Sequence, residues 1–213
     1  MKGLITKDFC LMLQRKRSFI VILMCGLVMS FSSDATFFVG WMIMIGSLFA
    51  LSTIAYDEHD NSYPFLMTLP ISRKGYACEK YVFGAICGLA FWLCALVFYI
   101  AAAAIRGISI DFANEIAPLI IMLFVPMLIL DFCIPFNLKY GSEKGRIYMI
   151  IFWGVIFTAV FVLYKLLAAD KGIPASGFPL ALPALLILLA VFTIVLTAAS
   201  VIWSIRIMEK KEF

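Results

Sequence analysis

The chain has 213 residues, of which 64% are hydrophobic and 14% are charged, with a formal net charge of +4. A soluble domain has roughly a quarter of its residues charged, and a globule of this length cannot bury so many apolar side chains. The composition therefore excludes an ordinary soluble domain and predicts a polytopic membrane protein. The basic residues lie at the edges of apolar segments, so the positive charge is no argument for a nucleic-acid partner.

Residues 1–17 are predicted to form an amphipathic helix that lies in the membrane interface. Its apolar residues recur close to helical spacing and are Leu4, Ile5, Phe9, Met12 and Leu13. The charged residues Lys2, Asp8, Arg15 and Lys16 lie largely elsewhere. We expect the basic side chains to meet anionic headgroups. The basic run before the next apolar segment also has the order of a signal peptide, but no convincing cleavage site follows, and we interpret the segment as a retained helix.

Six apolar segments of about the length that crosses a bilayer follow this helix. They are Ser18–Ser33, Ala35–Ala55, Tyr81–Ile105, Ile116–Phe136, Ile147–Leu167 and Phe178–Ile205. The first is short, about 24 Å as a helix. Pro126 is expected to kink the fourth, and Gly84-x-x-x-Gly88 in the third has the spacing of close helix contacts. The predicted fold is all-α, with six transmembrane helices in a single domain over residues 1–213.

The distribution of lysine and arginine predicts the orientation. With six spans both termini lie on one side, which then collects fourteen of the seventeen basic residues. Arg106, Lys165 and Lys171 lie opposite. Because basic residues accumulate in cytoplasmic loops, we expect both termini in the cytoplasm, together with the loops 56–80 and 137–146.

The loop 56–80 carries the most information. It begins with the acidic Asp57 and Glu58 and ends with the basic Arg73, Lys74 and Lys80. Between them lies an apolar island, Pro64–Pro70, that is too short to span a bilayer. Since an apolar loop is most simply explained by a cover, we expect a separate protein to dock on it.

Ser72 has the position of a helix N-cap for the third span. The cations that follow it would lie at a helix N-terminus, which is already partly positive. We therefore expect Asp57 and Glu58 to compensate for them, and we predict a charge clamp of Asp57, Glu58 and Lys80. Asp131, near the end of the fourth span, is expected to face protein or water, with Lys139 as its partner in preference to a role as an ion relay.

The sequence contains no signature of enzymatic or metal chemistry. No ATP-binding G-x-x-x-x-G-K-[ST] loop, G-x-S-x-G or H-E-x-x-H occurs, and His59 is the only histidine. The six cysteines have no C-x-x-C spacing and mostly adjoin apolar segments. We predict neither a catalytic residue nor a metal site, and we interpret His59 as a solvated loop residue.

Three stretches resemble a known family. They are Thr53–Glu58, Leu69–Lys74 with Glu79–Tyr81, and Pro135–Phe136 with Tyr140–Arg146. Together with Met1–Leu4 and Lys7–Asp8, they resemble permease subunits of bacterial ABC-2 type transporters, above all the small permeases similar to phenol-soluble-modulin exporters of Gram-positive bacteria. His59–Pro64 departs from the pattern of such permeases.

The resemblance implies an exporter of the plasma membrane, in which two permease chains pair and two cytoplasmic ABC ATPase chains bind below. ATP and Mg²⁺ would belong to the ATPase, and the cargo would be amphipathic peptides or hydrophobic toxic compounds. The coupling residues would be Pro64, Phe65, Leu66, Leu69, Pro70, Ile71, Ser72 and Arg73 in the first loop, and Tyr140, Gly141, Glu143, Lys144 and Arg146 in the second.

Two other classes remain open from the sequence. A noncatalytic membrane scaffold or sensor would carry the same loops without binding an ATPase. A polytopic enzyme acting on lipid headgroups needs acidic, basic or histidine side chains clustered at one depth, and the run Asp57–Asp60 is the only such cluster.

Overall fold

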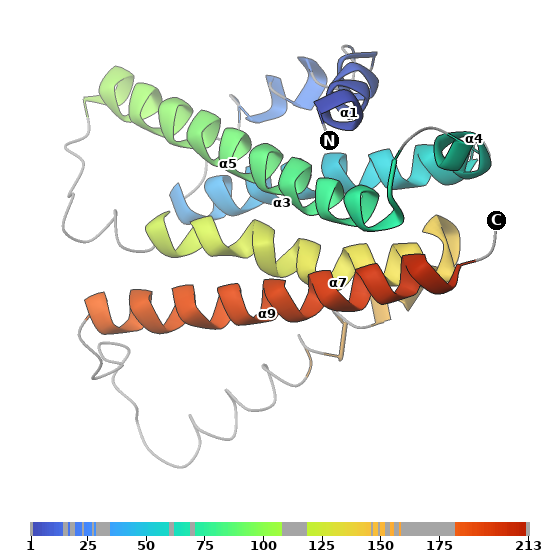
Figure 1. Cartoon of the computed structure of the whole chain (residues 1–213). Coiled ribbons are helices and arrows are strands. Elements are labelled where there is room, and N and C mark those ends of the chain that lie inside the picture. The colour runs from blue at the N-terminus through green and yellow to red at the C-terminus, as the bar shows by residue number, and fades with distance from the viewer. Residues whose placement is uncertain are drawn as a thin grey trace.

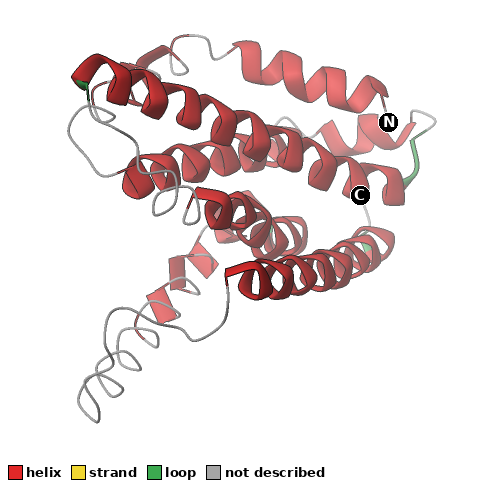
Figure 2. Cartoon of the chain, turned by 90° about the vertical axis from the view of Figure 1, so that its left-hand side faces the viewer, coloured by secondary structure: helices red, strands yellow, loops and turns green. Residues whose placement is uncertain are grey.

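The computed structural model describes residues 2–14, 17, 20–22, 24–26, 28, 35–59, 62–68, 71–107, 119–145, 147–148, 150–151, 154–155, 158 and 182–211. Within these ranges every regular element is a helix (Figures 1 and 2). The helices are α1 (Lys2–Gln14), α3 (Ala35–His59), α4 (Ser62–Thr68), α5 (Arg73–Arg106), the 3₁₀ turn η1 (Met122–Phe124), α7 (Val125–Tyr140) and α9 (Leu182–Lys210).

Four of the described helices are long and apolar enough to cross a membrane. They run over Phe38–Glu58, Arg73–Arg106, Leu119–Tyr140 and Leu186–Lys210, and they match the predicted second, third, fourth and sixth spans. The chain is a multi-pass helical membrane protein. The predicted first and fifth spans, Ser18–Ser33 and Ile147–Leu167, fall largely outside the described residues, so the count of six and the orientation remain predictions.

The helices extend further than the apolar segments from which they were predicted. α5 begins at Arg73, eight residues before the apolar run at Tyr81. The predicted N-cap is confirmed, because the Gly75 amide donates to the Ser72 hydroxyl at 3.0 Å. With α3 continuing to His59, the segment 56–80 is mostly helical and not an open loop.

The spanning helices form a bundle in which α3 packs on α5, α7 packs on α9, and the two pairs contact each other. Figure 1 shows that α3, α7 and α9 finish at the end of the bundle where α5 begins and where α4 lies. We call this the α4 end. The C-terminus and α1 lie close to it, and α1 contacts both α3 and α5.

Close packing of α5 on α7 depends on two glycines. A Cβ at Gly88 would stand 2.7 Å from the Pro126 Cβ, and one at Gly84 would collide with Leu130. The predicted role of Gly84-x-x-x-Gly88 in close contact is therefore confirmed. Pro126 lies in the first turn of α7, directly after η1, where the Val125 amide bonds to the Met122 carbonyl and keeps that oxygen paired.

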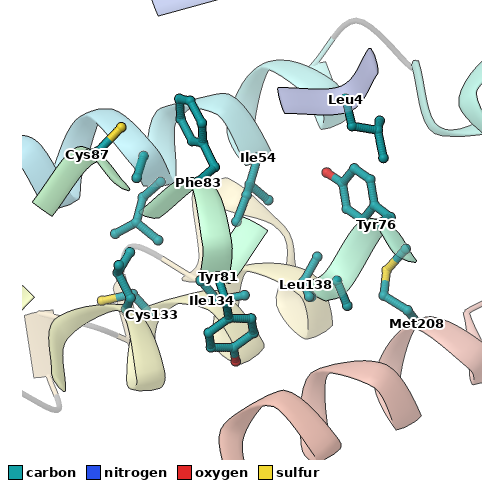
Figure 3. Close-up of a cluster of buried hydrophobic side chains, with 14 of the residues drawn as sticks. Leu4, Ile54, Tyr76, Tyr81, Phe83, Cys87, Cys133, Ile134, Leu138 and Met208 are labelled. Carbon is teal, nitrogen blue, oxygen red and sulfur yellow. The ribbon is translucent and has the colours of Figure 1, made fainter. Parts of the chain in front are cut away.

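The largest buried cluster lies toward the α4 end (Figure 3). It joins Leu4 of α1, Tyr76 and Phe83 of α5, Ile134 of α7 and Met208 of α9. The helical character predicted for residues 1–17 is confirmed for Lys2–Gln14, the placement of Asp8 away from the apolar residues was wrong, and the position in the membrane interface remains a prediction. Asp8 is buried on the same side as Leu4, while Phe9 and Leu13 are exposed.

Candidate functional site

α4 is the short helix that connects α3 and α5, and its two sides have different surroundings. Tyr63 and Leu66 are buried against the bundle, whereas the Phe65 side chain is 68% exposed. Burying a side chain such as Leu66 contributes about 1.5–3 kcal/mol, which holds the short helix in place. The exposed phenyl ring of Phe65 therefore lies on a helix that is held against the bundle.

Aromatic packing links α4 to the first turn of α5. The rings of Tyr63 and Tyr76 meet edge to face, with centroids 5.7 Å apart. The Tyr76 hydroxyl donates to Asp57 at 2.8 Å, near the end of α3. Burial raises the pKa of the Tyr63 hydroxyl, so this residue stays neutral at physiological pH. Because Tyr63 of α4 packs on Tyr76 of α5 and Tyr76 bonds to Asp57 of α3, a displacement of α4 acts on α3 and α5 together.

Five charged side chains gather where α1, α3 and α5 meet. Lys80 pairs with Asp8 and lies 3.1 Å from Asp57, and Lys7 lies 2.5 Å from Asp57. Lys80 also donates to the Thr53 hydroxyl at 3.1 Å, and Glu79 lies 3.8 Å from its ammonium group. We call Lys7, Asp8, Asp57, Glu79 and Lys80 the ion cluster.

The ion cluster is almost completely removed from water. Lys80, Asp8 and Glu79 have fully buried side chains, and only Lys7 is partly exposed. Burial lowers the pKa of Lys7, but the hydrogen bond that Lys7 donates to Asp57 and the charges of Asp57 and Asp8 outweigh this effect, so the net pKa is raised. Each buried charge depends on its partners, because a lone charge in this position would be costly.

The α4 end has two short segments: α4 itself, and residues 141–145 after α7. Glu58, at the end of α3, contacts the second segment. Its carboxylate accepts the Ser142 amide hydrogen at the start of a helical turn, residues 142–145. A carboxylate at a helix N-terminus is favourably placed relative to the helix dipole. Gly141 precedes this turn with φ of +81°, a left-handed conformation that glycine adopts without strain. Glu58 therefore holds the segment after α7 against the end of α3.

The end of α9 is tied to both segments. Arg73 donates to the Glu209 carbonyl at 2.9 Å, and Lys74 lies 3.2 Å from the Glu209 carboxylate. Lys211 donates to the Leu138 carbonyl at 3.2 Å and lies over the ring of Tyr63, 4.8 Å from its centroid. Burial lowers the pKa of Lys211, although the charge of Glu58 opposes this.

The structure places the predicted docking residues in three environments. Phe65, Glu143 and Lys144 are exposed, and Tyr140 is just exposed while stacking on Phe136. Leu66 is buried and Ile71 is half-buried against the core, so the bundle itself covers part of the island that we expected a partner to cover. The side chain of Pro64 and the residues Leu69, Pro70 and Arg146 lie outside the described part of the chain.

The predicted clamp residues divide between two contacts. Lys80 reaches Asp57, while Glu58 bonds to Ser142, and Arg73 donates to the Glu209 carbonyl of α9. Asp131 accepts a hydrogen bond from the Thr197 hydroxyl at 2.8 Å. The prediction that Lys139 is its partner was wrong, because the Lys139 ammonium lies over the Tyr140 ring. The side chain of His59 lies outside the described residues.

Sequence reasoning missed Lys7, Asp8, Tyr76 and Lys211 as parts of this site. One signal was present for Asp8, which lies four residues after Leu4 and therefore shares its face. No signal in the sequence joins residue 8 to residue 80 or residue 211 to residue 63, because these pairs form only when the bundle is assembled.

The contacts of the site can transmit force between helices, and its exposed surface can bind a protein. Tyr76 bonds to Asp57 and Lys80 pairs with Asp8, while the exposed surface is aromatic and charged. Among the described residues, no group of three or more histidine, cysteine, aspartate or glutamate side chains is arranged to hold a metal ion.

Comparison with known proteins identifies the family. Residues 3–209 match the family described as ABC-2 family transporter protein. No curated protein matches the sequence. The match covers nearly the whole chain and includes both segments of the α4 end, and the family pairs such membrane subunits with an ABC ATPase. With four helices among the described residues that can span a membrane, the chain belongs to the ABC-2 transporter family as a membrane permease subunit.

Proposed function

We propose that the α4 end docks a cytoplasmic ABC ATPase and that the chain uses the ATPase cycle to export amphipathic peptides or hydrophobic toxic compounds across the bacterial plasma membrane. ATP and Mg²⁺ would bind the ATPase, and a second permease chain, identical or related, would complete the transporter. The resemblance to phenol-soluble-modulin exporters supports this class of cargo. The family membership supports the ATPase partner.

The observation that carries the docking proposal is the exposure of Phe65 on an anchored helix. Aromatic side chains that are held rigidly and left exposed are typical anchors of protein interfaces. Tyr63 and Leu66 prevent α4 from folding back to bury Phe65, since they occupy the side that faces the bundle. The turn 142–145, with exposed Glu143 and Lys144, supplies a polar neighbour for the rim of such an interface.

The contacts behind α4 give the proposal a mechanical route. A push on α4 passes through Tyr63 and Tyr76 to Asp57, and so to the ends of α3 and α5. Lys211 and Arg73 carry the same displacement to α9. The spanning helices then move together. Such a joint movement is required if closure of the ATPase is to change the side of the membrane from which the cargo site is accessible.

The docking proposal is tested by changing Phe65 in the full-length chain expressed with its ATPase. Phe65→Asp adds a charge at the proposed interface and should abolish copurification of the ATPase and ATP-dependent transport. Phe65→Leu keeps an apolar contact and should retain both. Phe65 is exposed, so both variants should insert into the membrane at the wild-type level. Wild-type copurification and transport by Phe65→Asp would refute docking at this residue.

A further inference from the structure

A lateral groove lies among α5, α7 and α9, far from the α4 end. Its volume is about 830 Å³, within the range of roughly 300–1,000 Å³ typical of small-molecule sites. Its lining includes Ile86 of α5, Pro126 of α7 and Thr197 of α9. Ile86 and Thr197 each stand thirteen residues from the α4 end of their helix, or about 20 Å along it, and both lie within the apolar segments predicted to span the membrane.

The lining of this groove is apolar except for two threonines, Thr193 and Thr197. The Thr197 hydroxyl lies 2.8 Å from Oδ2 of Asp131, so the Asp131 side chain is directed at the groove wall. Asp131 is only 3% exposed, and within the described part of the chain its Oδ1 has no hydrogen-bond partner.

A buried carboxyl group with one unpaired oxygen requires an explanation. Buried polar atoms are almost always hydrogen-bonded, and an ionisable group within a membrane span is costly unless it serves a purpose. The ammonium of Lys139, the nearest cation along α7, is at the Tyr140 ring. The groove therefore combines an apolar channel for a hydrocarbon chain with an acidic side chain behind Thr197 that has no cationic partner among the described residues.

We propose that this groove binds a single-chain amphiphile that carries a protonated amine. The hydrocarbon chain lies along Ile86, Pro126 and Ile194, and the amine lies against Thr197 beside Asp131. The Thr197 hydroxyl oxygen lies 2.8 Å from two acceptors, Oδ2 of Asp131 and the Thr193 carbonyl. This oxygen can accept a hydrogen bond from the amine while its single hydrogen is donated to Asp131. An anionic headgroup is repelled at this position. The inference rests on the proposed export function and names the class of cargo that the groove selects.

Binding to the purified full-length chain in lipid nanodiscs tests the proposal, with empty nanodiscs as background. The probes are radiolabelled dodecylammonium, dodecyl sulfate and dodecanol, which share one chain length. A hydrogen bond to a charged group predicts that wild type binds dodecylammonium about tenfold to a hundredfold more tightly than dodecanol. Asp131→Asn, which keeps the size of the side chain, should reduce this preference to less than about threefold.

A pair of exposed alanines supplies the matched control for the location. Ala198 lines the groove and Ala101 does not. Ala198→Phe should abolish specific binding of dodecylammonium, and Ala101→Phe should bind it as wild type does. Phe65→Asp should also bind it normally, so a failure of ATPase docking is distinguished from a failure at the groove.

Three results would each overturn the proposal. Equal binding of the three probes by wild type would make the groove a nonselective site for lipid chains. A cation preference that survives in Asp131→Asn would remove the carboxyl group from recognition. Undiminished binding by Ala198→Phe would place the ligand elsewhere.

Discussion

At the scale of single residues, charges that are buried in pairs connect α1 to α3 and α5. Lys80 and Asp8 have no exposed side-chain surface, and they connect α5 to α1 across 72 residues of sequence. Lys74 and Glu209, by contrast, pair at 3.2 Å in an exposed position. Exposed ion pairs contribute little and buried charges that lose a partner cost much, so the two pairs should respond very differently to substitution.

Replacing Lys80 with methionine should destabilise the protein by about 3–5 kcal/mol, because Asp8 and Glu79 lose their nearest cation while still buried. Lys74→Met removes a lysine from the same helix and should cost less than about 1 kcal/mol. Denaturant unfolding in detergent measures both. Adding Asp8→Asn to Lys80→Met should recover part of the loss; equal effects of Lys80→Met and Lys74→Met would contradict the burial of the cluster.

The raised pKa of Lys7 predicts a response to alkaline pH. A lysine whose folded pKa exceeds the ordinary 10.5 contributes its full stabilisation below that value and loses it as pH rises through the folded pKa. The difference in melting temperature between wild type and Lys7→Met should therefore stay constant from neutral pH to about 10 and shrink above it. A difference that grows with alkaline pH would show that Lys7 is not held by Asp57 and Asp8.

At the scale of helices, hydropathy predicted which segments span the membrane but not where the helices end. The apolar runs of α3, α5, α7 and α9 are continuous stretches of sequence, so they can be recognised without the structure. The start of α5 at Arg73 was predicted from the Ser72 N-cap, but the burial of Lys80 beside Asp8 and Asp57 depends on tertiary contacts. In the same way, the apolar island suggested a contact surface, but the sequence could not assign Leu66 to the bundle and Phe65 to the outside.

Two glycine substitutions test the packing of α5 on α7. Gly88→Ala places a Cβ against the rigid ring of Pro126 and should destabilise the protein by about 1–3 kcal/mol. Gly40→Ala in α3 meets only the Met122 sulfur at 3.7 Å, an ordinary contact, and should be neutral or stabilising by up to about 1 kcal/mol. Unfolding in detergent compares them, and a neutral Gly88→Ala would mean that α5 and α7 are further apart.

At the scale of the whole molecule, the two segments predicted to face the cytoplasm lie together. Glu58 joins the end of α3 to Ser142, and Lys211 joins the chain after α9 to α4 and α7. Charge asymmetry predicted that these parts share one side of the membrane. The pairs that bring them into contact are separated by as many as 148 residues, between Tyr63 and Lys211, and became visible only in the assembled bundle.

Topology is tested by labelling intact cells with a membrane-impermeant maleimide and measuring the signal above the wild-type background. Gly107 follows α5 at the end opposite α4, and Gly107→Cys should be labelled from outside. Ser142→Cys should be labelled only after the membrane is permeabilised. Labelling of Ser142→Cys in intact cells would reverse the predicted orientation and place the α4 end outside.

The most direct test of the central claim is site-specific photocrosslinking in cells that express the full-length chain with its ATPase. A benzoylphenylalanine at position 65 should form an adduct with the ATPase, because Phe65 is 68% exposed on the α4 end. The same group at position 107, on the opposite end, should form none. An active transporter whose position 65 never crosslinks to the ATPase would contradict the account.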